Sequence, residues 1–223
     1  MELVTGGAGF IGSHLVDALV AQGKRVRVLD NFSSGREEFL AHHGEQVEVV
    51  RADLLDLDAT KEAMEGVETV HHMAANPDIR LGTEVTDTDL RQGTVATYNV
   101  LEAMRSAGVS RISFSSSSAI YGEADVMPTP ETYGPIKPIS LYGASKLASE
   151  GLISAWCGTF GAKSWIHRFA NIVGPRGTHG VIFDFIHKLK ADPTRLEVLG
   201  NGLQEKSYMS AEDCVRAMVH LVD

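Results

Sequence analysis

A tyrosine and a lysine four residues apart, Tyr142 and Lys146, are the side chains of this sequence best suited to proton transfer. They open a segment of periodic apolar residues that runs to Phe160, and residues four apart on a helix share one face. A phenol with a pKa of about 10 is a poor base at neutral pH, but a neighbouring ammonium group favours the phenolate. We therefore expect Lys146 to lower the pKa of Tyr142 and to make it a usable proton acceptor.

A run of serines, Ser115 to Ser118, follows the apolar residues that end at Phe114. A hydroxyl at this place can hydrogen-bond the oxygen whose proton Tyr142 takes, so the sequence offers a base, a group that tunes it and a group that orients the substrate. A Tyr and a Lys at this spacing also occur where a buried ring lies beside a lysine that reaches solvent. The rest of the chain has to decide between the two interpretations.

The N-terminal stretch has the pattern of a dinucleotide-binding turn. Residues Leu3 to Thr5 form a short apolar strand, the glycine-rich stretch Gly6 to Gly12 follows at once, and apolar residues at helical spacing come next. Glycines in this setting permit a tight turn and let a pyrophosphate approach the amide groups at the start of a helix. The predicted contacts are Gly6, Gly9, Phe10, Ile11 and Gly12.

Asp30 ends the second apolar stretch, Val26 to Leu29. An acidic residue at about this distance after the glycines binds the ribose hydroxyls of the adenosine. Its carboxylate would also repel a 2′-phosphate, so NAD is expected as the cofactor rather than NADP. The alternative is that Asp30 only caps the loop from Asn31 to Gly35.

Apolar strands and helical segments alternate along the rest of the chain. The expected strands are 47–50, 68–72, 111–114 and 164–167, and the longest expected helices are 87–107 and 142–160. This alternation predicts an α/β fold with a doubly wound parallel sheet, whose ligands bind beyond the carboxyl ends of the strands. The residues expected there are Asp53 and Leu54 at the adenine and Ala74 and Ala75 behind the cofactor.

Composition limits the partners. A net charge of −9 over 223 residues argues against nucleic acid or an anionic membrane as a broad partner, although local amides and a few cations can still hold an anionic ligand. The chain starts without a basic and apolar leader, and no apolar run approaches the length of a membrane span. We expect a cytoplasmic protein.

Neither the cysteines nor the paired histidines indicate a metal site. Cys157 and Cys214 lie far apart, which also argues against a disulfide framework and fits a reducing compartment. His71 and His72 are neighbours on an expected strand, so they point to opposite faces, and no acidic cluster accompanies them. We assign the histidines a structural role and predict no metal.

Several motifs together resemble those of the extended short-chain dehydrogenase/reductases, and most closely those of nucleotide-sugar epimerases of the UDP-glucose 4-epimerase type. The resemblance covers essentially the whole chain. It also implies that the residues after Asp30 contact NAD, namely Asn31, Ser33, Ser34 and Gly35. The motifs that carry it are GGAGFIG at 6–12, Asp30-Asn31 with Ser33-Ser34-Gly35, the serine run leading into Tyr121-Gly122, YGASK at 142–146 and RFANIVGP at 168–175.

The resemblance implies a catalytic set and a mechanism. The family's catalytic Ser or Thr lies 25 positions before the Tyr, which selects Ser117 as the partner of Tyr142 and Lys146. Tyr142 would remove the proton of the sugar's 4-hydroxyl while a hydride passes to NAD, and the hydride would return to the opposite face of the 4-keto sugar. Lys146 would also hold the nicotinamide ribose. The implied substrate contacts are Ser117, Ser118, Tyr142, Asn171, Val181, Leu199 and Lys206, with Asn171 and Lys206 at the diphosphate.

Three positions disfavour neighbouring subclasses of the family. Dehydratases of nucleotide sugars carry an Asp-Glu pair where this chain has Ser118 and Ala119, and decarboxylases of nucleotide-uronic acids keep a glutamate at the position of Ala119. Reductases that make deoxysugars use NADP, which Asp30 opposes. The resemblance therefore implies an epimerase, an isomerase with no net redox change.

The chain departs from the family pattern in two ways. Gly93 stands where the family has an asparagine that is regarded as the fourth member of the catalytic set, and a glycine inside a helix costs about 1 kcal/mol relative to alanine. The sequence given ends at Asp223, whereas full epimerases continue substantially further. We expect an NAD-binding domain at 1–170 and a partial nucleotide-sugar-binding lobe at 171–223.

Two alternatives to an active 4-epimerase stay open: an NAD-binding module without activity, and another NAD-dependent nucleotide-sugar enzyme such as a uronate epimerase. The resemblance also implies a homodimer, in which the helices 87–107 and 142–160 of both subunits form a four-helix bundle. The alternative is that the subunit's own sheet covers the apolar faces of these helices.

Overall fold

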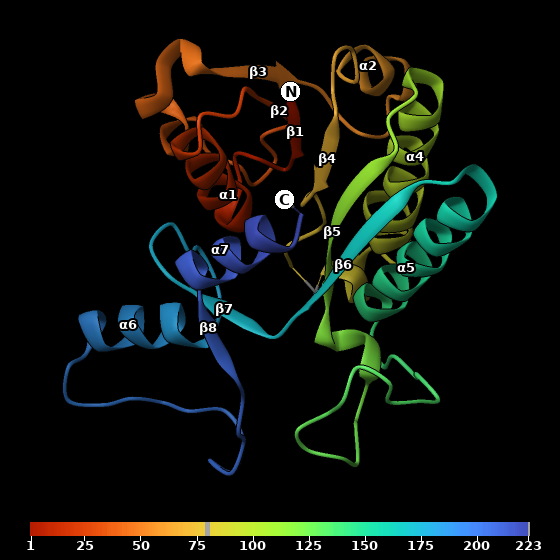
Figure 1. Ribbon diagram of the computed structural model, residues 1–223. Helices are drawn as coiled ribbons and strands as arrows, with labels where there is room; N and C mark the ends of the chain where they lie inside the picture. Colours follow the sequence, from red (N-terminus) through yellow and green to blue (C-terminus); the bar gives the residue numbers. More distant parts are fainter. Residues whose placement is uncertain (79–80, 223) are drawn as a thin grey trace.

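The computed structural model describes residues 1–78 and 81–222 and has a six-stranded parallel sheet at its centre (Figure 1). Its strand order is β3-β2-β1-β4-β5-β6, so the order reverses between β1 and β4. This topology confirms the predicted doubly wound parallel sheet and puts a ligand crevice beyond the carboxyl ends of these two strands. The strands are β1 (Glu2–Thr5), β2 (Val26–Asp30), β3 (Val47–Arg51), β4 (Thr69–His72), β5 (Arg111–Ser117) and β6 (Lys163–Phe169).

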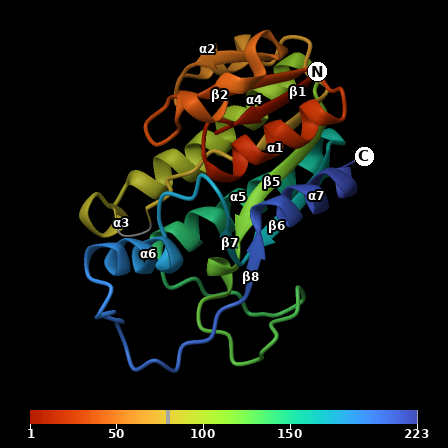
Figure 2. The ribbon, with the colours of Figure 1, turned by 90° about the vertical axis from the view of Figure 1, so that its left-hand side faces the viewer.

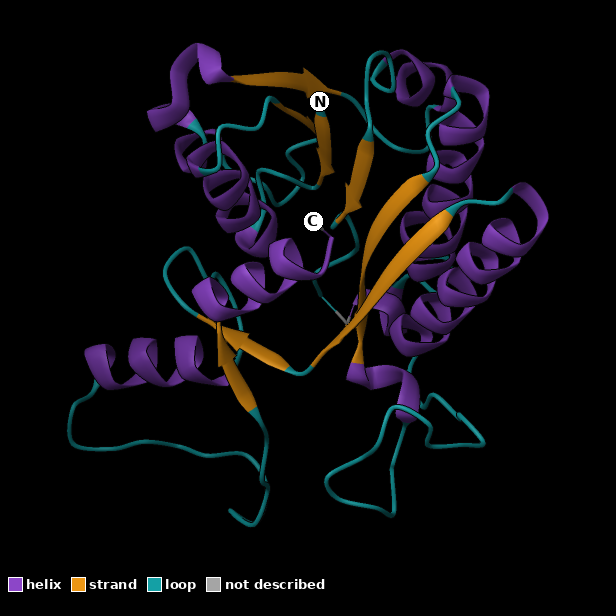
Figure 3. Cartoon of the chain, in the orientation of Figure 1, coloured by secondary structure: helices purple, strands orange, loops and turns teal. Residues whose placement is uncertain are grey.

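Helices cover both faces of the sheet, as the secondary-structure colours of Figure 3 make clear. Alternate residues of a strand face opposite sides. Accordingly Val4 and Val28 pack in one core cluster with the helices α1 and α7, whereas Leu3 and Leu29 pack in a second cluster with α4 and α5. The helices are α1 (Phe10–Ala21) and α7 (Ala211–Val222) on the first face and α2 (Leu57–Glu62), α4 (Ala96–Ala107) and α5 (Leu141–Phe160) on the other.

A second, two-stranded parallel sheet follows β6 and consists of β7 (Asn171–Val173) and β8 (Tyr208–Ser210). The helix α6 (Val181–Ala191) lies on the chain between these strands and has no fully buried residue. The last helix, α7, follows β8 and packs against α1, as the turned view in Figure 2 shows. The division of the chain at residue 170 remains a prediction.

Across the part of the chain that the structure describes, no helix is both long enough and apolar enough to cross a lipid bilayer.

Two segments differ from the expected elements. β5 runs to Ser117, because its pairing with β6 continues through the first serines of the run and hydroxyl side chains do not interrupt it. The expected helix from 87 to 107 begins with a π-helix, η3 (Leu90–Val95), and only then becomes α4. A π-helix has wider turns than an α-helix. The remaining short elements are η1 (Glu37–Phe39), η2 (Ala41–Gln46), α3 (Leu81–Glu84) and η4 (Ser118–Tyr121).

We predict that Gly12→Ala destabilises the protein by about 1–3 kcal/mol. A Cβ at Gly12 would lie 2.1 Å from Gly6 O, so the first turn of α1 would have to move away from the glycine turn. Gly151→Ala is the matched control, since the Cβ position of Gly151 on α5 is open and the substitution should stabilise by about 0.5–1 kcal/mol. Urea unfolding followed by circular dichroism measures the free energy of unfolding of both variants. Equal changes in that free energy would contradict the close approach of Gly12 to Gly6.

Candidate active site

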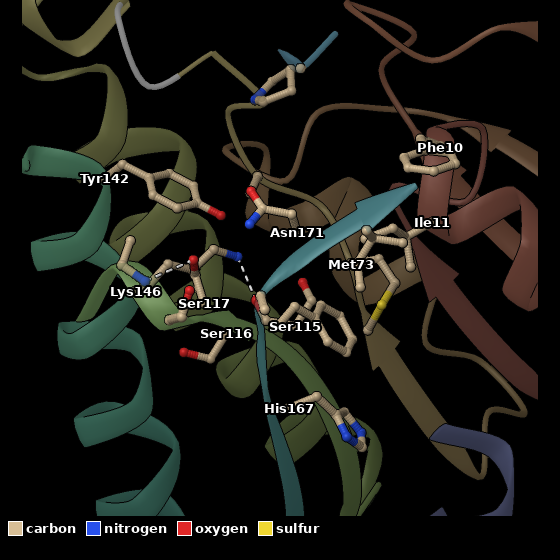
Figure 4. Close-up of a pocket in the computed structure, with 18 of the residues that line it drawn as sticks. Phe10, Ile11, Met73, Ser115, Ser116, Ser117, Tyr142, Lys146, His167 and Asn171 are labelled. Atoms are coloured by element: carbon tan, nitrogen blue, oxygen red, sulfur yellow. Dashed lines mark hydrogen bonds between the residues drawn. The ribbon is translucent and has the colours of Figure 1, made fainter. Parts of the chain in front are cut away.

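A cavity of about 1940 Å³ lies beyond the carboxyl ends of the strands, and the segments 171–183 and 205–208 form its opposite wall. Figure 4 shows the part of it where α5 faces the end of β5. The structure brings most of the expected site residues together in this cavity. Those that line it are Gly6, Gly9, Phe10, Ile11, Gly12, Asp30, Asn31, Ser33, Ser34, Asp53, Leu54, Ala74, Ala75, Ser117, Ser118, Tyr142, Lys146, Asn171, Val181 and Lys206.

Two expected site residues do not line the cavity. Leu199 is 79% exposed and lies outside it, in the irregular stretch between α6 and β8, where sequence periodicity gives no guide to position. Gly35 lies behind the cavity wall: a Cβ there would come within 2.9 Å of Asp30 Oδ1. Its close packing against Asp30 makes Gly35 a support of the loop rather than a residue of the lining.

The glycine turn fits the pyrophosphate of a dinucleotide. Gly6 has a φ of +67°, and a Cβ there would lie 2.7 Å from the backbone of Ala74 at the end of β4. Gly9 is the N-cap of α1 and provides no side-chain cap, and the first turn holds no acidic residue. Because the first amide groups of a helix lack intrahelical partners, this end of α1 presents N–H donors to an anion in the cavity.

Asp30 caps its loop, as one of the two alternatives proposed, and its contact with the ribose remains a prediction. Its Oδ2 accepts a hydrogen bond from Ala8 N at 2.9 Å, and its Oδ1 accepts one from Phe32 N at 2.8 Å. The carboxylate therefore braces the glycine turn and caps its own loop while it lines the cavity. Asn31, the next residue, donates to Asp53 Oδ2 at 2.9 Å and so joins the ends of β2 and β3.

The three expected catalytic side chains come from two elements that face each other. Ser117 ends β5, whereas Tyr142 and Lys146 lie one turn apart on α5, and Figure 4 shows all three pointing into the same space. Lys146 Nζ donates to Ser115 O at 2.6 Å and lies 5.7 Å from the centroid of the Tyr142 ring. The Ser140 side chain caps α5 by accepting from Gly143 N at 3.0 Å, which places Tyr142 in the first turn.

The pKa of Tyr142 is raised in this structure, so the expected net lowering of that pKa beside Lys146 is wrong. Burial raises the pKa of Tyr142, a hydrogen bond with Ser117 opposes that rise, and the carboxylate of Asp89 adds to it. Burial also lowers the pKa of Lys146 to about 8, against the carboxylates of Asp89 and Glu150, which raise it. The largest cause is the same for both groups: loss of water disfavours each charged form. The groups that favour the charged forms, the Ser117 hydroxyl at Tyr142 and the two carboxylates at Lys146, compensate only in part.

A partly buried ion pair that the sequence analysis missed braces this end of the sheet. Arg168, near the end of β6, donates to both oxygens of Glu150 on α5, with Nη2 at 2.7 Å from Oε2. Ser116 Oγ donates to Glu150 Oε1 at 2.5 Å, and Arg168 Nη1 reaches Tyr121 Oη at 2.9 Å. Glu150 follows Lys146 by four residues, and this spacing indicates a shared face of α5. The sequence therefore contained a signal for the position of Glu150.

The predicted diphosphate residues lie on the opposite wall. Asn171 Nδ2 donates to Ser207 O at 3.1 Å, which ties the start of β7 to the residue after Lys206. Asn171 and Lys206 are therefore held side by side through the backbone of Ser207. This arrangement gives the cavity a donor-rich wall, as an anionic ligand would need.

The paired histidines have the structural role assigned to them. His72 hydrogen-bonds Thr5 Oγ1 at 2.7 Å and Thr97 Oγ1 at 3.1 Å, and burial lowers its pKa to about 3, with a further lowering by the charge of Lys146. His71 instead contacts Glu2 Oε2 at 3.0 Å.

A second group of possible metal ligands lies outside the cavity. Ligand-type atoms of Asp17, His42 and His43 lie within 4.8 Å of one another. Both histidines contact the same oxygen, Asp17 Oδ1, at 3.0 and 2.7 Å, and Arg176 pairs with Asp17 Oδ2 at 2.8 Å. Hydrogen bonds and an ion pair thus account for this group, and the absence of a metal stays a prediction.

Known proteins match this chain along nearly its whole length. A sequence model described as the NAD dependent epimerase/dehydratase family matches residues 2–223. A UDP-glucose 4-epimerase of Mycolicibacterium smegmatis is 36% identical over 225 residues, which cover 97% of this chain and 71% of that protein. A solved UDP-galactose 4-epimerase is 47% identical with a TM-score of 0.89, over 99% of this chain and 70% of that one. The UDP-glucose 4-epimerase of Thermotoga maritima, solved with UDP-glucose, is 33% identical with a TM-score of 0.92. The match covers 100% of this chain and 73% of that one.

We predict that Asp30→Ala weakens the binding of NAD by about tenfold or more and reduces the preference for NAD over NADP. The loss of the hydrogen bonds to Ala8 and Phe32 loosens the turn for both cofactors, whereas the loss of the carboxylate's repulsion helps NADP alone. Calorimetric titration with each cofactor measures the ratio of the two dissociation constants. Asp58→Ala, on exposed α2, is the control. An unchanged ratio would show that Asp30 acts as a cap only.

Proposed function

Because the chain belongs to the NAD-dependent epimerase/dehydratase family, we propose that it is a nucleotide-sugar 4-epimerase of the UDP-glucose 4-epimerase type. The observation that carries the proposal is the placement of Ser117, Tyr142 and Lys146 in one cavity with the glycine turn. This placement puts a proton-transfer group and a dinucleotide-binding turn around the same ligand space. The substrate that fits such a site is a hexose linked to a nucleoside diphosphate, with UDP as the expected nucleotide.

The chain's own residues supply binding, orientation and proton transfer. NAD held by the glycine turn would supply the acceptor and donor of the hydride exchanged with C4 of the hexose. Tyr142 Oη takes the proton of the 4-hydroxyl and gives it back to the 4-keto oxygen, so no net proton leaves the site. Ser117 Oγ hydrogen-bonds the same sugar oxygen, and Lys146 supplies the positive charge that favours the phenolate. Asn171 and Lys206 hold the diphosphate while the hexose turns.

The site also bears on the other candidate functions. Ser118 and Ala119 both line the cavity, so the positions at which dehydratases carry their acidic pair hold a hydroxyl and a methyl group here. A module that only binds NAD would have no need of Tyr142 facing Ser117 in the cavity. This geometry favours the 4-epimerase over the binding module, and a uronate epimerase remains the alternative within the same chemistry.

We further propose a homodimer through a four-helix bundle of the segment 90–107 and α5 from each subunit. α4 and α5 lie side by side, and Tyr98 packs edge-on against Trp156 with ring centroids 6.2 Å apart. Tyr98 and Phe160 nevertheless remain 44% and 52% exposed, so the subunit's own sheet does not cover this face. Light scattering should give the mass of two chains, and a monomeric mass would refute the bundle.

Cys157 and Cys214 are free, and the expected cytoplasmic location stays a prediction.

We predict that Tyr142→Phe lowers the rate of C4 inversion by about 10²–10⁴-fold and leaves NAD bound, because it removes the phenolic oxygen but keeps the ring. The measurement is NMR of UDP-galactose incubated with the protein, alongside the absorbance of bound nicotinamide. Tyr133→Phe is the control, since Tyr133 does not line the cavity.

Two results would contradict this assignment. A Tyr142→Phe variant that loses NAD and inverts normally once NAD is restored would remove Tyr142 from catalysis. A wild-type chain that keeps NAD but inverts neither UDP-galactose nor its N-acetylated counterpart would be an NAD-binding module.

A further inference from the structure

The guanidinium of Arg168 makes contacts beyond its ion pair with Glu150. Along one edge, Nε lies 3.0 Å from Oε1 and Nη2 lies 2.7 Å from Oε2 of Glu150. The third nitrogen, Nη1, donates instead to Tyr121 Oη at 2.9 Å and to the backbone oxygen of Glu131 at 3.0 Å. Arg168 therefore joins α5 to two residues that follow the end of β5.

One of these two residues belongs to a loop that forms a rim of the cavity. This rim segment, residues 122–140, runs from the end of η4 to the start of α5 and is the green loop beyond β5 in Figure 1. It thus connects the strand end that carries Ser117 to the helix turn that carries Tyr142. Residues 127–129 and 131–132 of the rim segment line the cavity.

Few other contacts hold the middle of the rim segment in place. Its own hydrogen bonds are local, such as the one from Tyr133 N to Pro130 O at 3.0 Å. Met127 is 75% exposed, so hydrophobic burial does not anchor this part of the loop. Among the described residues, Arg168 donates the one hydrogen bond that reaches residues 126–133 from another element of the protein.

Tyr121 provides a second link between Arg168 and the rim segment. The central carbon of the guanidinium lies 5.2 Å from the centroid of the Tyr121 ring, so Arg168 contacts the ring as well as the hydroxyl. The ring of Tyr121 in turn meets that of Tyr133 edge-on, with the centroids 6.1 Å apart. Arg168 thus reaches the rim segment directly at Glu131 and through Tyr121 at Tyr133.

The other edge of the guanidinium is fixed to the elements that carry the proposed catalytic groups. Glu150 lies one turn after Lys146 on α5, and its Oε1 also accepts a hydrogen bond from Ser116 Oγ at 2.5 Å. Ser116 immediately precedes Ser117 on β5. An arginine suits this place, because its planar set of N–H donors binds a carboxylate along one edge and leaves donors for other acceptors, which a lysine cannot do.

We propose that Arg168 is a positioning residue that holds the rim segment in place over the hexose end of the cavity. The inference rests on the proposed function in one respect, the presence of a hexose beside Tyr142. A loop that is already held in place loses less conformational freedom when the substrate binds. Without Arg168, the substrate would have to order the rim segment itself, and its affinity would fall.

The expected kinetic signature is a rise in KM with little change in kcat. The catalytic groups keep anchors that do not involve Arg168: the Ser140 side chain caps α5, and Lys146 donates to Ser115 O. Loss of the rim contacts should therefore weaken substrate binding and leave the chemical step nearly intact. A general loosening of the site would lower kcat as well.

Arg168→Lys keeps a positive charge beside Glu150 and removes the planar set of donors. We expect it to raise the KM for UDP-galactose by about tenfold, the effect of a lost hydrogen bond to a charged group, and to leave the affinity for NAD unchanged. Tyr121→Phe keeps the ion pair and the ring, so it should raise KM by about two- to threefold. Tyr133→Phe is the matched control, because it leaves every hydrogen bond of Arg168 intact and keeps the edge-on ring contact.

Limited proteolysis tests the anchoring without substrate. A glutamyl endopeptidase can cleave after Glu131 when the rim segment opens, and after Glu205 in the exposed stretch before β8. We expect Arg168→Lys to speed cleavage after Glu131 by about tenfold, because cleavage follows the population of the open loop, and to leave cleavage after Glu205 unchanged. Mass spectrometry of the fragments measures both rates. Equal acceleration at the two sites would mean that the variant only destabilises the protein, and would overturn the inference.

The two measurements keep the inference separate from the proposed function. Selective acceleration after Glu131, in a protein whose wild type inverts no UDP-galactose, would uphold the anchoring and contradict the proposed function. Inversion by Arg168→Lys with unchanged KM and unchanged cleavage after Glu131 would do the reverse. If Arg168→Lys does not fold, Tyr121→Phe carries both measurements, and equal results for it and Tyr133→Phe would overturn the inference.

Discussion

The site depends on holding a lysine side chain almost entirely out of water. Lys146 is 3% exposed, its Nζ donates to Ser115 O at 2.6 Å, and it lies 4.8 Å from the centroid of the Phe114 ring. β5 supplies both contacts, so the packing of α5 on the sheet is coupled to the place of the ammonium group. The same packing brings Tyr142, one turn earlier on α5, to Ser117 at the end of β5. The packing around Lys146 is thereby coupled to the relative position of the three groups proposed for catalysis.

Burial works against charge on both members of the pair. It raises the pKa of Tyr142 and lowers that of Lys146, so each group is pushed toward its neutral form. The proposed proton transfer by Tyr142 nevertheless requires a phenolate, at least briefly. In surroundings of low polarity each remaining charge acts more strongly than it would in water, so a few nearby groups decide the protonation state. The site is responsive to added charge for that reason.

The parts of this site that local patterns encode could be predicted from the sequence, and those that depend on long-range contact could not. Strand–helix alternation predicted the sheet, and the four-residue spacing predicted that Tyr142 and Lys146 share a helical face. The direction of the pKa shift of Tyr142 was mispredicted because it depends on burial depth, which no spacing reveals. The pairing of Glu150 with Arg168 joins residues from α5 and β6. Leu199 lies outside the cavity, in a stretch whose sequence has no periodicity to indicate its position.

The departures from the family pattern around residue 93 are physically linked. The wide turn of η3 brings its backbone so close to α5 that a Cβ at Gly93 would lie 2.7 Å from Ser145 Oγ, and Thr97 Oγ1 bonds back to Gly93 O at 2.8 Å. A side chain at this position would have to move the Ser145 side chain, and Ser145 is the residue before Lys146 on α5. The glycine at 93 therefore goes together with the serine at 145, since the two positions share one space between η3 and α5.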